Sequence, residues 1–134
     1  MSVRIVIADD REVVRQGVRR ILQSRPEWEI CGEAENGRQA VSLAQELNPD
    51  ALIMDISMPL MNGLEATSEI STLNANIRVL ILTMHEPADV AELARKMGAR
   101  GLVMKSDAGR HLISALERVL SGGTFFPPSE YRTR

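Results

Sequence analysis

Residues 52–59 read LIMDISMP, and this stretch decides the fold. Three apolar residues run directly into Asp55, and Pro59 follows a few residues later. A short, continuous apolar run with such boundaries is typical of a strand that is buried on both faces, as in a parallel sheet. Its carboxyl end lies at the edge where open α/β sheets bind ligands. Asp55 is therefore the first candidate for a functional residue.

Three other apolar runs also end in polar side chains. They are residues 3–8 before Asp9 and Asp10, residues 79–82 before Thr83, and residues 101–104 before Lys105. The carboxyl ends of parallel strands meet at one edge of a sheet, so we expect these acids, the hydroxyl and the amine to converge there. This combination is typical of a site for phosphate and metal.

Helical patterns alternate with the strand-like runs, which is typical of βαβ units. The expected helices cover residues 13–22, 40–47, 64–73, 90–97 and 112–120, and a further strand covers about residues 29–34. Right-handed crossovers place helices on both faces of the sheet. If the first two strands pair and the chain then crosses to the third, the order is 2-1-3-4-5. We therefore predict an α/β fold with a five-stranded parallel sheet of the flavodoxin-like kind.

Composition limits the classes of protein to consider. The chain has 134 residues, 44% hydrophobic and 25% charged, with a net charge of −2, which fits one globular domain. This charge argues against nucleic-acid binding by the chain itself. Cys31 is the only cysteine, which favours a reducing compartment. The sequence has no membrane span or signal peptide, so we expect a cytoplasmic protein without membrane contact.

The predicted acid cluster has an electrostatic cost. If Asp9, Asp10 and Asp55 lie within ~5 Å, each pair repels by about 3 kcal/mol at an effective dielectric constant of about 20. Three pairs total roughly 10 kcal/mol, comparable to the stability of a whole domain. Lys105 and a divalent cation can offset this repulsion. Mg²⁺ suits oxygen ligands, and no His or Cys adjoins the acids in sequence to favour zinc.

Asp10 also has a simpler interpretation, as the N-cap of the first helix with Glu12 in the first turn. Taken alone, Asp9 and Asp10 fit capping and function about equally. Together with Asp55, Thr83 and Lys105 they favour a site. A carboxylate beside Mg²⁺ is a nucleophile toward phosphorus and forms an acyl phosphate. The sequence has no glycine-rich loop of the G-x-x-x-x-G-K-[ST] type.

These residues together resemble the receiver domain of bacterial response regulators. The motifs are Asp9-Asp10, Asp55 with Pro59 and Gly63, Thr83, and Lys105 after Gly98-Ala99-x-Gly101. The resemblance spans about residues 3–122, and residues 82–86 (LTMHE) and 122–127 (GGTFFP) are similar to the NarL/LuxR type. It implies a receiver domain at residues 1–123. Residues 124–134 would begin a linker to a helix-turn-helix DNA-binding domain outside this chain.

The resemblance also implies roles for the site residues. Asp55 would accept phosphate from a sensor histidine kinase, and the protein would be a signalling switch of a two-component system, with no enzymatic turnover beyond its own phosphorylation and dephosphorylation. The Mg²⁺ ligands would be Asp10, Asp55 and the backbone carbonyl of Ser57, with Asp9 acting through water. Thr83 would move toward the phosphoryl group and Lys105 would pair with it. We further expect a homodimer on phosphorylation.

Three positions depart from the family pattern. Leu102 stands where many receivers carry Tyr or Phe, so coupling between the threonine and an aromatic ring is not expected in its usual form. Ser106 replaces the proline that often follows the lysine. We expect a trans peptide there, because a cis bond before a non-proline residue costs about 3 kcal/mol. Met84 is bulkier than the small residue common at its position and is expected to narrow access to Asp55.

Other functions stay open at this level. A stand-alone receiver would act by phosphorelay or by protein contact. An aspartate-nucleophile phosphatase of the haloacid dehalogenase type also builds Mg²⁺ sites at strand ends. It typically has a second aspartate two residues after the nucleophile, however, and here that position is Ser57, a poor general acid at neutral pH. A pseudo-receiver that no longer takes phosphate would not need to keep every charged residue of the site.

Overall fold

The computed structural model describes residues 2–84 and 87–126, except for the side chains of residues 87–89. Strands and α-helices alternate along the described chain. They are β1 (Val3–Ala8), α1 (Glu12–Leu22), β2 (Trp28–Ala34), α2 (Gly37–Leu47), β3 (Ala51–Met54), α3 (Gly63–Leu73), β4 (Arg78–Thr83), α4 (Pro87–Met97), β5 (Gly101–Met104) and α5 (Ala108–Leu120). A 3₁₀ turn (Lys105–Asp107), which was not predicted, joins β5 to α5.

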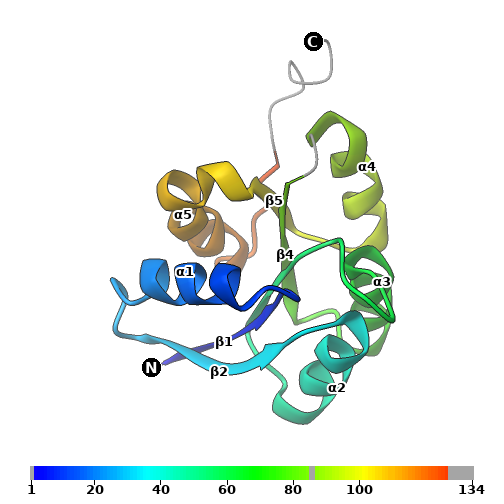
Figure 1. The fold of residues 1–134 in the computed structure, drawn as a ribbon, viewed down its shortest axis with the longest axis horizontal. Coiled ribbons are helices and arrows are strands. Elements are labelled where there is room, and N and C mark those ends of the chain that lie inside the picture. Colours follow the sequence, from blue (N-terminus) through cyan, green and yellow to red (C-terminus); the bar gives the residue numbers. More distant parts are fainter. Residues whose placement is uncertain (1, 85–86, 127–134) are drawn as a thin grey trace.

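The strands form one parallel sheet in the order β2-β1-β3-β4-β5, as predicted. Helices α1 and α5 cover one face, and α2, α3 and α4 cover the other (Figure 1). The central strand β3 is buried along its whole length. Leu52 and Met54 pack into the core beneath α2–α4, whereas Ala51 and Ile53 pack beneath α1 and α5. Burial on both faces explains why this strand reads as a continuous apolar run rather than an alternating one.

Local signals determine several helix ends. Asn62 Oδ1 accepts a hydrogen bond from Glu65 N (2.9 Å), and Asn62 N donates to Glu65 Oε1 (3.1 Å), so a capping box begins α3. Helix α4 begins at Pro87, three residues before the expected start, at a position that proline favours. That helix ends before Gly98, whose φ of +108° is accessible to glycine.

The capping role considered for Asp10 is wrong. Helix α1 begins at Glu12, so Arg11 occupies the N-cap, and its side chain makes no capping hydrogen bond. The neighbouring acid instead interacts with this backbone: Asp9 Oδ1 accepts a hydrogen bond from Arg11 N at 2.9 Å. Asp10 lies one residue too early to cap the helix and is exposed.

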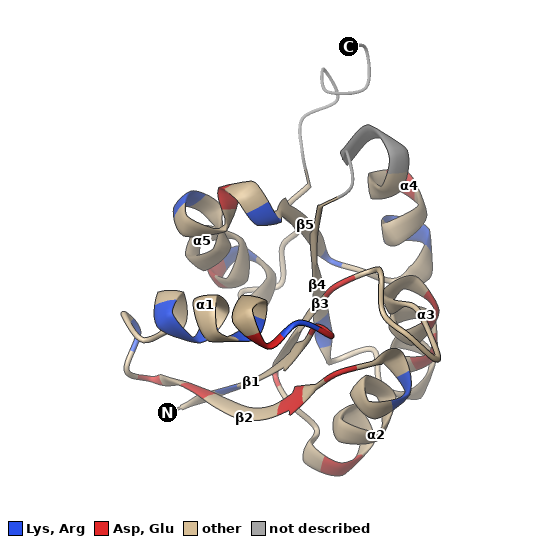
Figure 2. Ribbon diagram, in the orientation of Figure 1, with Lys and Arg blue, Asp and Glu red and all other residues tan. Residues whose placement is uncertain are grey.

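Charged residues of both signs are spread over the helices, the loops and β2 (Figure 2). No basic face of the kind used to bind nucleic acid stands out among the described residues. None of the described helices is long and apolar enough to cross a membrane.

Strand register brings the predicted site together. Ala8 pairs with Met54 across β1 and β3, so the next residues, Asp9 and Asp55, leave the sheet side by side. Asp55 N donates a hydrogen bond to Ala8 O at 2.9 Å, which extends the pairing by one step. Thr83 pairs with Met104 across β4 and β5, and Lys105 follows at once.

Gly63 is the glycine on which this part of the chain depends most clearly. A Cβ at position 63 would lie 1.9 Å from Asp55 O, so we expect Gly63→Ala to lower the unfolding free energy by about 2–3 kcal/mol. Gly17→Ala is the matched control, because nothing lies within 4 Å of a Cβ there. In the middle of α1 it should gain about 0.5–1 kcal/mol. Urea unfolding measures both, and equal effects would contradict this prediction.

Candidate functional site

Three carboxylates meet at the carboxyl edge of the sheet. Asp9, Asp10 and Asp55 each place one oxygen within 4.8 Å of the others. Asp9 and Asp55 are 2% and 5% exposed, whereas Asp10 is exposed. The predicted convergence of these residues is confirmed. Like charges this close, two of them buried, repel strongly because little water screens them.

Lys105 supplies the opposing charge. Its Nζ lies 2.8 Å from Asp9 Oδ2 and 3.4 Å from Asp55 Oδ1. Burial raises the pKa of Asp55, and the Asp9 charge raises it further, while Lys105 acts in the opposite direction. One lysine among three carboxylates leaves the cluster negative, which favours binding of a further cation.

The donor set fits a hard divalent cation such as Mg²⁺. Asp9 Oδ2 is buried and accepts no properly oriented hydrogen bond from the described residues, although Lys105 Nζ lies nearby. The cluster presents carboxylate oxygens, with no His or Cys among its members. Oxygen ligands of this kind suit Mg²⁺ and do not favour zinc.

A cleft of about 220 Å³ opens beside Asp55. Its lining residues are Asp10, Arg11, Asp55, Ser57, Met84 and Lys105. Met84 is 64% exposed, so this flexible side chain stands at the rim, as the sequence suggested. A cleft of this size admits a phosphoryl group next to Asp55.

Thr83 is placed differently from the other predicted site residues. It ends β4 and is fully buried, and it is not among the residues that line the cleft. Thr83 therefore lies at the same edge of the sheet as Asp55 but behind the surface of the cleft. The following residues, His85 and Glu86, lie outside the described residues.

An arginine network around Asp9 was missed by the sequence analysis. Arg15 Nη1 donates to Asp9 O at 2.7 Å, and Arg15 Nε pairs with Glu33 Oε1 at 2.8 Å. Arg19 also pairs with Glu33. The network ties α1 to β2 and anchors the backbone that presents Asp9. A signal was available, since Arg15 lies on the same helical stripe as the buried Val18 and Leu22, where a charged residue requires a partner.

Two of the departures from the family pattern have clear structural outcomes. Leu102 is 2% exposed and packs in the core beneath α2–α4, so it cannot alternate between inward and outward positions as a polar-tipped ring does. The peptide bond before Ser106 is trans, as expected.

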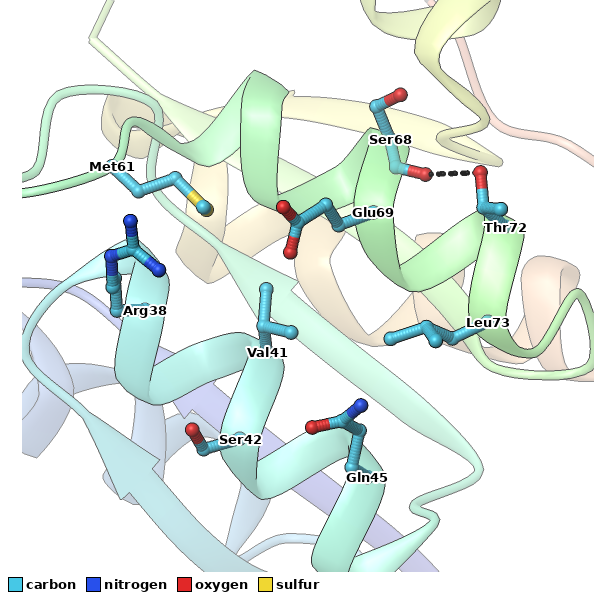
Figure 3. Close-up of a pocket in the computed structure, with 9 residues that line it drawn as sticks. All are labelled: Arg38, Val41, Ser42, Gln45, Met61, Ser68, Glu69, Thr72 and Leu73. Carbon is cyan, nitrogen blue, oxygen red and sulfur yellow. Dashed lines mark hydrogen bonds between the residues drawn. The ribbon is translucent and has the colours of Figure 1, made fainter.

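A larger hollow, of about 480 Å³, lies between α2 and α3 (Figure 3). Side chains from both helices and from Met61 border it, and they mix apolar, hydroxyl and charged groups. Its size alone does not make it a site, because its lining groups form no acid cluster like that beside Asp55. The chemistry of the described residues therefore points to the smaller cleft.

Comparison with known proteins agrees with this geometry. Residues 5–117 match the family described as the response regulator receiver domain. The chain belongs to this family. Receiver domains are phosphorylated by histidine kinases and bind Mg²⁺ at an acidic cluster, and this receiver domain has such a cluster at Asp9, Asp10 and Asp55.

The relatives are response regulators of the NarL/LuxR type. The transcriptional regulatory protein DegU of Brevibacillus brevis is 38% identical over 127 residues, which are 95% of this chain and 54% of that protein. A LuxR-family regulator of Aurantimonas sp. SI85-9A1 has a TM-score of 0.92 and 34% identity, covering 99% of this chain and 96% of that one.

A third relative is the isolated receiver domain of RcsB from Salmonella enterica serovar Typhimurium, solved in the presence of the phosphomimetic BeF₃⁻. It has a TM-score of 0.87 and 26% identity, over 100% of this chain and 98% of that one. RcsB has also been solved as dimers bound to DNA. The present receiver domain spans about half the length of the curated relatives it matches.

The raised pKa of Asp55 predicts a stabilising substitution. The folded state binds the Asp55 proton more tightly than the unfolded chain does, so stability from this group is greatest below its unfolded pKa and is lost as pH rises through its folded pKa. At neutral pH without Mg²⁺, Asp55→Asn removes the repulsion between Asp55 and Asp9, and it also removes the ion pair between Asp55 and Lys105. We expect a net gain of about 1 kcal/mol, which is about 4 °C in the unfolding midpoint.

The matched control is Glu46→Gln, on the exposed side of α2 and outside the acid cluster. It should change stability by less than about 0.5 kcal/mol. Thermal unfolding in the presence of a chelator measures both variants. A loss of stability in Asp55→Asn would mean that Lys105 already neutralises the cluster, contrary to this interpretation.

Proposed function

We propose that this receiver domain is a phosphorylation-activated switch, with Asp55 as its phosphoacceptor. The observation that carries the proposal is the position of Asp55: its carboxylate lines an open cleft, 3.4 Å from Lys105 Nζ and beside two further acids. Those acids suit one Mg²⁺, and the cleft would give a phosphodonor a path to the otherwise buried Asp55.

In the proposed reaction, an Asp55 carboxylate oxygen attacks the phosphorus of a phosphohistidine on a sensor kinase. An oxygen–phosphorus bond forms as the phosphorus–nitrogen bond breaks, and the imidazole leaves with the electron pair and takes a proton from water. Attack by water on the acyl phosphate later returns Asp55 and inorganic phosphate. Bound Mg²⁺ would supply positive charge against the phosphoryl oxygens.

The chain's own residues would then have distinct roles. Asp10, Asp55 and the backbone carbonyl of Ser57 would hold Mg²⁺, with Asp9 acting through water. Lys105 would leave its contact with Asp9 to pair with the phosphoryl group. Thr83, buried at the end of β4, would donate a hydrogen bond from its hydroxyl to a phosphoryl oxygen.

For the whole protein we propose the regulatory half of a cytoplasmic transcription factor. The similarity to DegU and to LuxR-family regulators supports this, as does the share of their length that the chain covers. DNA contact would belong to a helix-turn-helix domain joined through residues 124–134, and the phosphorylated receiver would form a homodimer. A stand-alone receiver is the alternative. The hypothesis of an aspartate-nucleophile phosphatase has less support, because an exposed Ser57 occupies the position of the general acid in such enzymes.

Intact-mass spectrometry tests the phosphoacceptor role. After incubation with Mg²⁺ and acetyl phosphate or phosphoramidate, we expect one phosphoryl adduct, because Asp55 is the acid best placed beside both Lys105 and the cleft. The adduct should require Mg²⁺ and be absent from Asp55→Asn.

The matched control is Asp107→Asn, an acid in the 3₁₀ turn that pairs with Arg110 outside the acid cluster and should keep the adduct. A Met84→Ala variant tests whether the methionine at the rim slows the entry of a small phosphodonor into the cleft. An adduct that persists in Asp55→Asn would contradict the assignment, as would the absence of any adduct in both the wild type and Met84→Ala.

A further inference from the structure

The segment after α5 does not leave the domain at residue 124, where the predicted linker begins. Gly122, with φ of +97°, turns the chain, and Gly123 N donates to Arg118 O at 2.9 Å. The segment then runs beside β5, between α5 and α4 (Figure 1, red-orange trace). Phe125 forms a parallel bridge with Gly101 there. We call residues 124–126 the latch segment.

The backbone of the latch segment forms hydrogen bonds with backbone groups along the outer edge of β5. Leu102 N donates to Phe125 O at 2.8 Å, and Phe125 N donates to Arg100 O at 3.0 Å. An edge strand otherwise exposes such groups to solvent or to another chain. The approach is close, since a Cβ on Gly101 would lie 2.9 Å from Phe125 O.

The two phenylalanines contact opposite sides of the sheet. Phe125 packs against the core beneath α1 and α5, with its ring centroid 6.2 Å from that of His111 on α5. Phe126 packs against the core beneath α2–α4, and the Arg95 guanidinium of α4 lies 4.3 Å from its ring centroid. The latch segment therefore ties α4, β5 and α5 to one another.

We propose that the latch segment is held in the unphosphorylated state and released when Asp55 is phosphorylated, so that it reports the state of the site to whatever follows it. This proposal rests on the proposed function of Asp55. It also assigns residues 124–126 a role in switching that the predicted domain boundary did not give them.

The reason lies in how the latch segment is held. Lys105 directly follows β5 and already contacts Asp9 and Asp55. A phosphoryl group would add about two negative charges there and draw Lys105, and with it the end of β5, toward the new group. Phe125 is bound to β5 by hydrogen bonds, whereas Phe126 is stacked under Arg95 of α4. A shift of β5 relative to α4 would pull these two contacts in different directions and weaken the hold on the latch segment.

The aromatic residue of this switch would then come from the latch segment. Leu102, at the position where related receivers often carry a ring, donates its backbone N–H to Phe125 O and shares a core cluster with Phe126. The segment after α5 thus brings two aromatic residues to the strand that lacks one at position 102.

Amide hydrogen exchange of the full chain, measured by NMR, tests the proposal. In the ligand-free wild type, the Leu102 and Phe125 amides should be protected. Phe126→Ala should speed exchange at Leu102 about tenfold, and Arg95→Gln about threefold, because each removes a contact of the latch segment. Lys96→Gln, the next exposed cation on α4, is the matched control and should change nothing. Amides of the central strand β3 should stay protected throughout.

Adding Mg²⁺ and beryllofluoride, a phosphoryl analogue, tests the link to Asp55. With the analogue bound, as fluorine NMR reports, exchange at Leu102 and Phe125 should speed up about tenfold in the wild type. Binding of the analogue without faster exchange at these amides would contradict the proposed release of the latch segment, but it would not contradict the proposed function of Asp55. A wild-type Leu102 amide that exchanges as fast as in Phe126→Ala would also contradict the proposed latch. Failure of the analogue to bind overturns the proposed function and, with it, the coupled release.

Discussion

Parallel pairing of β1 with β3 requires Asp9 and Asp55 to leave the sheet side by side, where little water reaches them. Asp10 adds a third carboxylate within 4.8 Å. Two groups of neighbouring side chains stabilise this arrangement. Lys105 contacts both buried acids, and the Arg15 network holds the backbone of Asp9. Such a concentration of like charge destabilises the folded state, and destabilising arrangements of this kind are typical of functional sites.

The excess of negative charge in the acid cluster links the two proposed activities of the site, cation binding and phosphorylation of Asp55. Because Lys105 contacts only Asp9 and Asp55, and Asp10 adds a third carboxylate, the cluster has capacity for another cation. Once a phosphoryl group is on Asp55, the same lysine has a stronger partner. The change in its position is the physical event that can be transmitted along β5. The latch segment lies on the far edge of that strand, bound to its backbone and to α4, so it is well placed to sense the movement.

The fold was predictable because its signals are local. The apolar run before Asp55, Pro87 at the start of a helix and Gly98 at its end all have the structure that their chemistry indicates. The convergence of the acids and Lys105 followed from sheet topology alone. What was missed depends on long-range geometry: Arg15 bonds to a carbonyl and to a residue on β2, and Phe125 pairs with a strand more than twenty residues earlier. Asp10 was open to two interpretations because a cap and a ligand look alike in sequence.

The most direct test of this electrostatic account is the unfolding midpoint of the wild type as Mg²⁺ is added, beside an Asp10→Asn variant. Asp10 is exposed, so the substitution should leave the fold intact while removing one ligand. At ten times the dissociation constant, Mg²⁺ should stabilise the wild type by about 1.4 kcal/mol, or about 5 °C, and the gain should saturate. Most of it should be absent from Asp10→Asn and from KCl at equal ionic strength. An equal rise in both proteins, or with KCl, would mean that the acids respond to general screening and hold no specific cation.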